Sequence, residues 1–303
     1  MEKQNPIYRF FQHIANVWIY GRIWIALCVF SYVQSSFILF HGEYSVQPFA
    51  VILALGSYLL YIVPFLYFGL IKKTKRSYNP RQVWIEERIT RLYATGGAAL
   101  LGLLVAVFLH PSIVWLLVQK GVVIAIISVL YMLPVIPWKG KRYALREIGG
   151  LKPIILTLVW WYMGAYIVAK DSPHEMSCFK NHLSLTGDFL LALQFVFMLV
   201  LCVMFDIRDY DSDKQNGIRT WPVMLGIGHT QMLMLAVCIV AIIPVWFMPV
   251  PSSVKYAYTV TFGVLAFFNT QKLTAYPWWF YDVAVDGMMI LQWVLLVALS
   301  LQF

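Results

Sequence analysis

Nine long apolar segments follow one another along this chain and constrain its fold more than any other feature. The chain is 61% hydrophobic and only 12% charged, which lies outside the range of soluble domains. Segments of roughly 18 or more apolar residues are long enough for a helix to cross a bilayer. The sequence therefore predicts a single all-α integral-membrane domain, residues 1–303, with nine transmembrane helices. The expected spans are about 17–40, 46–71, 92–109, 112–136, 151–169, 188–205, 228–248, 253–270 and 284–302.

Basic residues gather in alternate loops of this predicted arrangement. The N-terminal segment and the loops 72–91, 137–152, 206–221 and 271–283 hold 18 Lys and Arg, in the order 2, 7, 5, 3 and 1. The loops between them hold only Lys170 and Lys180, with Lys255 just beyond the last. The positive-inside rule predicts a cytoplasmic N-terminus, an external C-terminus and a location in the cytoplasmic (inner) membrane. The net charge of +9 then faces anionic lipid head groups, and no nucleic-acid partner is needed to explain it.

An acidic run directly follows the sixth apolar segment. Four of the 14 acidic residues fall within eight positions: Asp206, Asp209, Asp211 and Asp213. If the sixth helix continues through Asp213, three of them share a sector about 60° wide together with Tyr210, while Asp211 points away. Carboxylates are costly beside a membrane, and three on one stripe suit a hard cation such as Mg²⁺. A solvated loop with local acid–base pairs is the alternative interpretation.

Two stretches resemble motifs of a known family. The string Asp-x-x-Asp-x-x-x-Asp-x-x-x-Gly-x-x-Thr-x-Pro-x-x-x-Gly, from Asp206 to Gly226, resembles the second aspartate-rich motif of the UbiA superfamily of intramembrane prenyltransferases. The sequence Tyr131-Met132-Leu133-Pro134, followed by Lys139-Gly140-Lys141-Arg142, is similar to a basic stretch that follows the fourth span of that family. Nine spans with a cytoplasmic N-terminus also agree with the family's topology.

The resemblance implies Mg²⁺-dependent transfer of an isoprenyl group from an isoprenyl diphosphate to a lipophilic acceptor, an aromatic quinone or haem precursor for example. It implies Asp206, Asp209 and Asp213 as metal ligands, with Asp209 and Asp213 as the catalytic residues. The residues that it implies for binding the diphosphate are Lys139, Lys141, Arg142 and Arg208. The diphosphate would lie at the cytoplasmic side, and the isoprenyl tail would run into the membrane.

Four further residues are candidates for the substrate pocket: Arg22, Trp160, Trp161 and Tyr210, the last of which lies within the acidic run. Trp160 and Trp161 fall near the middle of the fifth span, where they would line a tail channel or stabilise a cation, or simply pack between helices. Arg22, early in the first span, would reach the diphosphate or extend to the membrane interface.

The chain departs from the family pattern at the end of the second span. The family carries its first aspartate-rich motif there, but residues 58–73 contain neither an acidic residue nor an asparagine.

Three functions stay open: a prenyltransferase that depends on the second motif, a catalytically silent isoprenoid-binding relative, and a transporter. Transport is disfavoured because the charges crowd into one set of loops. Asp282 and Asp286, at the start of the last span, would add polarity to the site or favour the helix N-terminus. The acceptor, the prenyl chain length and the oligomeric state are left open.

Overall fold

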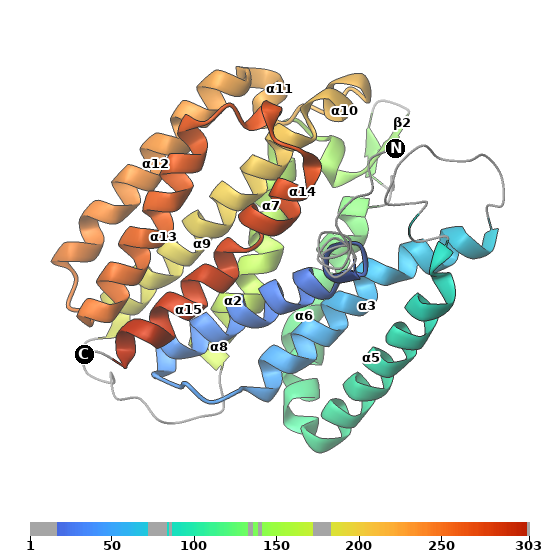
Figure 1. The fold of residues 1–303 in the computed structure, drawn as a ribbon, viewed down its shortest axis with the longest axis horizontal. Helices are drawn as coiled ribbons and strands as arrows, with labels where there is room; N and C mark the ends of the chain where they lie inside the picture. The colour runs from blue at the N-terminus through green and yellow to red at the C-terminus, as the bar shows by residue number, and fades with distance from the viewer. Residues whose placement is uncertain are drawn as a thin grey trace, which may run out of the picture. The chain divides into compact units, whose positions relative to one another are not determined.

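The computed structural model is helical almost throughout (Figure 1). It describes residues 17–71, 84, 87–132, 136–138, 141–171 and 183–301. A bilayer offers no water to unpaired backbone groups, so apolar segments of this length form helices, which satisfy their own N–H and C=O groups. The long helices are α2 (Ile23–His41), α3 (Pro48–Ile71), α5 (Ile89–Leu109), α6 (Pro111–Met132), α7 (Leu151–Trp161), α9 (Leu183–Arg208), α12 (Ile227–Phe247), α13 (Ser252–Thr270) and α15 (Met288–Ser300).

Shorter elements join or extend these helices. A two-stranded antiparallel hairpin follows α6, with Ile136 opposite Tyr143. The π-helical turn η2 continues α7 into α8, and η4 leads into α15. The short elements are β1 (Ile136–Trp138), β2 (Lys141–Tyr143), η1 (Leu145–Glu147), η2 (Tyr162–Tyr166), α8 (Ile167–Asp171), α10 (Tyr210–Gln215), α11 (Trp221–Leu225), η3 (Leu273–Ala275), α14 (Trp278–Phe280) and η4 (Tyr281–Val285).

Each of the nine predicted spans corresponds to a helical segment of the described residues. Seven of these segments are long and apolar enough to cross a membrane, judged by length and composition. They are Ile23–His41, Ile89–Leu109, Pro111–Tyr131, Leu151–Lys170, Leu185–Arg208, Ile227–Phe247 and Tyr281–Ser300. Of α3, the residues whose side chains the structure describes form a shorter apolar stretch, Pro48–Ile62, and α13 is not among the seven. The protein is therefore a polytopic integral-membrane protein, while nine crossings stay a prediction.

The chain divides into two units, residues 1–31 with 46–113 and residues 32–45 with 114–303. In the first unit α3 packs against α5, and Tyr58 and Leu92 are buried at their contact. The Tyr58 hydroxyl donates a hydrogen bond to Thr95 Oγ1 at 2.8 Å.

The second unit is built around α9, which packs against α7 and α12, while α13 packs against both α12 and α15. Phe197 of α9 is fully buried and stacks on Tyr32, with ring centroids 6.2 Å apart. Tyr32 also lies against Gly164 in η2, where an added Cβ would stand 2.4 Å from the Tyr32 ring. Glycine at this position lets the ring approach the bulged helix.

Contacts between helix ends show that α7 and its continuation α8 run antiparallel to α9. At one end, Lys152 at the start of α7 contacts Asp206 near the end of α9, and Arg208 contacts Asp282 in η4. At the other end, Lys170 of α8 pairs with Asp188 near the start of α9. The loops 137–152, 206–221 and 271–283, which the charge pattern assigns to one side of the membrane, therefore meet at one end of this unit.

The residues of the Asp206–Gly226 motif form a series of turns at this end. Gly217, with φ +71°, ends α10 in a conformation that residues with a Cβ rarely adopt. Pro222 stands in the first turn of α11, where its missing N–H costs no hydrogen bond. Gly226, with φ +85°, separates α11 from α12.

Candidate active site

The acidic run lies where α9 gives way to α10. The predicted continuous helix is wrong in one respect: α9 ends at Arg208, and α10 begins only at Tyr210. Asp209 stands between them with φ −87° and ψ 5°. Its N–H still bonds to the Phe205 carbonyl, and its carbonyl accepts from the Asp213 N–H, at 3.0 and 2.8 Å. The chain turns here without losing these hydrogen bonds, and the three aspartates separate into two groups.

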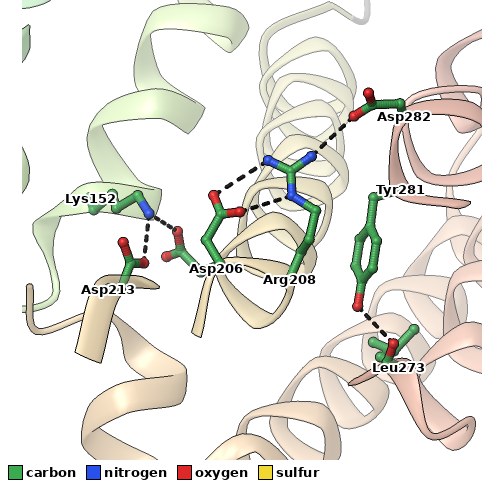
Figure 2. Close-up of polar contacts among 8 residues, drawn as sticks. Lys152, Asp206, Arg208, Asp213, Leu273, Tyr281 and Asp282 are labelled. Atoms are coloured by element: carbon green, nitrogen blue, oxygen red, sulfur yellow. Dashed lines mark hydrogen bonds and ion pairs between the residues drawn. The ribbon is translucent and has the colours of Figure 1, made fainter. Parts of the chain in front are cut away.

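Asp206 and Asp213 share one cation, Lys152 (Figure 2). The Lys152 ammonium lies 3.0 Å from Asp206 Oδ1 and 2.7 Å from Asp213 Oδ2. The exposed fractions of the three side chains are 11%, 2% and 7%. Charge-assisted hydrogen bonds of this length are strong, and the burial shields them from water and salt.

Asp209 forms an ion pair with Arg208 and not with Lys152. Arg208 Nε donates to Asp209 Oδ1 at 2.9 Å. Its Nη1 donates to Asp282 Oδ1 at 3.0 Å (Figure 2). The guanidinium also lies over the Phe205 ring, 4.7 Å from its centroid. Arg208 thereby joins the end of α9 to η4, and Tyr281 of η4 donates its hydroxyl to the Leu273 carbonyl at 3.0 Å. We call Lys152, Arg208, Asp206, Asp209, Asp213 and Asp282 the polar cluster.

The loop before α7 positions Lys152. The Gly150 N–H donates to the Arg219 carbonyl at 2.7 Å, and Trp221 Nε1 donates to the Gly150 carbonyl at 3.0 Å. An added Cβ at Gly150 would stand 3.3 Å from Met224 Cε. These contacts hold the start of α7 against the segment that follows α10, so that Lys152 reaches both carboxylates.

The donor set of the polar cluster suits Mg²⁺. Four carboxylates against two cations leave a formal surplus of two negative charges. Asp206 Oδ2 is buried and has no hydrogen-bond partner among the described residues. Mg²⁺ in phosphate-binding sites is held by one or two carboxylates together with the phosphate oxygens. Within the described residues no three His, Cys, Asp or Glu side chains are grouped to hold a metal ion, so the Asp206–Asp213 pair is the candidate.

The three aromatic candidates have local contacts of their own. The Trp161 indole N–H donates to the Leu191 carbonyl at 2.7 Å, and its ring contacts Phe195 edge-on. Trp160 is partly buried beside it, and both residues lie about 13 Å beyond Lys152 along the helix. Tyr210 accepts a hydrogen bond from Lys214 at 3.4 Å on α10. The structure thus places these three side chains outside the polar cluster.

The structure describes only part of the basic stretch, and it places Arg22 in the first unit. Lys139 lies outside the described residues, and so do the side chains of Lys141 and Arg142, whose backbone forms β2. Tyr131 lies at the end of α6. Arg22 belongs to the first unit, where its guanidinium lies 5.4 Å from the centroid of the Tyr61 ring.

Lys152 was not predicted to be a site residue. In the sequence it is only one of the basic residues of the loop 137–152. A signal was nevertheless present. A cation in the first turn of a helix faces the positive end of the helix dipole, so Lys152 requires an acidic partner. Asp282, one of the two acids at the start of the last span, pairs with Arg208 and so belongs to the polar cluster.

Comparison with known proteins decides the family. The chain matches the UbiA prenyltransferase family over residues 72–278, which is more than half of its length. The chain belongs to the UbiA prenyltransferase family. The match includes five of the six residues of the polar cluster, all but Asp282, and it begins after the end of α3, where the family's first aspartate-rich motif is expected. No curated protein and no solved structure matches the chain.

Proposed function

We propose that this UbiA-family protein transfers an isoprenyl group from an isoprenyl diphosphate to an apolar aromatic acceptor inside the membrane. The observation that carries the proposal is the polar cluster at the end of the apolar helices of the second unit. An isoprenyl diphosphate has the matching shape, a highly charged head on an apolar tail. Its head would bind at the cluster, and its tail would extend along the helices.

The residues of the cluster have distinct proposed roles. Lys152 and Arg208 would donate hydrogen bonds to diphosphate oxygens, together with Lys139, Lys141 and Arg142 of the hairpin region. Asp206 and Asp213 would hold Mg²⁺, and Asp209 would join them once Arg208 turns to the diphosphate, so that Asp209 and Asp213 lie closest to the reaction. When bound, Mg²⁺ would neutralise the charge that develops on the leaving diphosphate.

The apolar interior would protect the reacting group. Heterolysis of the allylic C–O bond leaves the electron pair on the diphosphate and a carbocation on the isoprenyl carbon. The acceptor ring supplies the electrons of the new C–C bond, and its proton leaves to the diphosphate or to water. Buried aromatic side chains of the second unit, such as Phe197 and Phe262, exclude the water that would otherwise quench the cation.

The charge pattern supports a cytoplasmic site. The loops that meet at the polar cluster carry most of the basic residues of this unit, and positive residues favour the cytoplasmic side. We therefore propose that the cluster faces the cytoplasm, in a chain that crosses the cytoplasmic membrane nine times with its C-terminus outside.

A second candidate function is isoprenoid binding without turnover. It is favoured by the fact that each of the three motif aspartates already pairs with Lys152 or Arg208. The acid-free end of the second span favours it as well, because the family's first set of carboxylates is missing there.

A transfer assay separates the two functions. Membranes that contain the wild-type protein, radiolabelled isoprenyl diphosphates of several chain lengths and a panel of aromatic acceptors should yield a labelled lipophilic product when Mg²⁺ is present. EDTA should abolish this product, and Asp209→Asn should lower it to background. If wild type and Asp209→Asn give the same background while the diphosphate still raises the melting temperature of the wild type, the protein binds isoprenoids without turnover.

A further inference from the structure

Lys152 occupies the position between Asp206 and Asp213 that a metal ion would take. Its nitrogen lies 3.0 and 2.7 Å from one oxygen of each carboxylate, which are distances typical of an ammonium group. Ligands of Mg²⁺ lie at only about 2.0–2.1 Å, so both carboxylates are in contact with an ammonium and would have to close in to bind this ion. The pair therefore already holds a cation, and this cation is part of the chain.

The position of Lys152 requires this arrangement. A charged amine that is 11% exposed at the first turn of a helix is disfavoured both by desolvation and by the helix dipole. Its two buried carboxylates would be equally unfavourable without it. As long as no other ion is present, Lys152 therefore needs the two carboxylates, and the carboxylates need Lys152, to balance their buried charges.

We propose that Lys152 is a built-in counter-ion that closes the Asp206–Asp213 pair to divalent metal ions in the substrate-free protein. A metal ion binds at the pair only when the ammonium leaves it. A lysine side chain is long and flexible, so it can move to a neighbouring anion without a change of the backbone. The diphosphate is such an anion. Mg²⁺ would thus enter together with the substrate. This entry step rests on the proposed function, but the closure of the carboxylate pair by Lys152 does not.

The test measures Mn²⁺ binding to the full-length protein in detergent, by the loss of the free-ion signal in electron paramagnetic resonance, without diphosphate. Lys152→Met removes the competing charge, and we expect its affinity for Mn²⁺ to exceed that of the wild type by at least about tenfold. Lys152→Arg keeps the charge and should bind Mn²⁺ as weakly as the wild type. The matched control is Lys214→Met, which removes a lysine next to Asp213 that bonds to Tyr210 instead of the pair.

Two results would overturn the proposal. One is a gain of affinity in Lys152→Met no larger than that in Lys214→Met. The other is a wild-type protein that binds Mn²⁺ saturably without diphosphate and loses this binding in Asp213→Asn. The second comparison needs no Lys152 variant, so it decides even if that variant is unstable.

If Lys152→Met folds poorly, it is purified in Mn²⁺, and its melting temperature is compared before and after EDTA. A fall in melting temperature after EDTA that occurs only in this variant supports the proposal. It shows that the metal ion stabilises the Asp206–Asp213 pair in place of the ammonium. A variant that stays unfolded with Mn²⁺ contradicts it. Because no diphosphate is present, these outcomes are independent of the transfer assay, and failure of one leaves the other unaffected.

Discussion

Asp206→Asn and Asp213→Asn are each expected to lower isoprenyl transfer by about 10²- to 10³-fold, the usual cost of losing one preorganised electrostatic group in an active site. Each substitution removes one of the two carboxylates that hold Lys152 and that would bind Mg²⁺. The other carboxylate remains, so Lys152 keeps a partner and the protein should still fold. The measurement is the initial rate of labelled product formation, at equal amounts of monodisperse protein.

Asp211→Asn is the matched control for these two variants. Asp211 lies on the same short helix as Asp213 but is exposed, and it makes no ion pair within the described residues. Its replacement removes the same charge and should change the rate by less than about twofold, because exposed charges interact weakly through water. Equal losses in all three variants would show that net charge, and not the Lys152 contact, controls activity.

Arg208→Met is expected to destabilise the protein by roughly 2–3 kcal/mol, less than a fully buried ion pair because Arg208 and Asp209 are partly exposed. The variant leaves Asp209 and Asp282 without the guanidinium that joins α9 to η4. Methionine preserves much of the contact with Phe205, so the loss reflects the charge. We expect the melting temperature in detergent to fall by several degrees.

Lys170→Met provides the comparison for Arg208→Met. Lys170 pairs with Asp188 at 2.8 Å, but both side chains are about half exposed, so the loss should be below about 1 kcal/mol. A melting temperature of Arg208→Met that equals that of Lys170→Met would mean that Arg208 does not tie α9 to η4.

The helices could be predicted from the sequence because the apolar segments are long and their backbone groups have no alternative partner in a bilayer. Helical phase also predicted that Asp206, Asp209 and Asp213 share one face and that Asp211 points away. The structure brings Asp206 and Asp213 together and leaves Asp211 exposed, but it separates Asp209 from the other two. These features depend on neighbours within a few residues, which a sequence pattern contains directly.

The break at Asp209 and the role of Lys152 depend on distant parts of the chain. Lys152 meets Asp213 across 61 positions, and Arg208 meets Asp282 across 74. No periodicity links such residues, so the contacts of Lys152 with Asp206 and Asp213, and of Arg208 with Asp282, were not apparent from the sequence. The lysine at the start of α7 was the available sign, since a cation there needs an acid nearby.

Equilibrium binding of a radiolabelled isoprenyl thiolodiphosphate, which does not ionise readily, tests most directly whether the polar cluster binds an isoprenoid diphosphate. With Mg²⁺ present, the purified wild-type protein should bind the analogue saturably, inorganic diphosphate should compete with it, and Asp206→Asn and Asp213→Asn should weaken it at least about tenfold. Asp211→Asn should bind it as the wild type does. Saturable binding that is equal in all four proteins, or no saturable binding at any chain length, would contradict the assignment of this cluster as the diphosphate site.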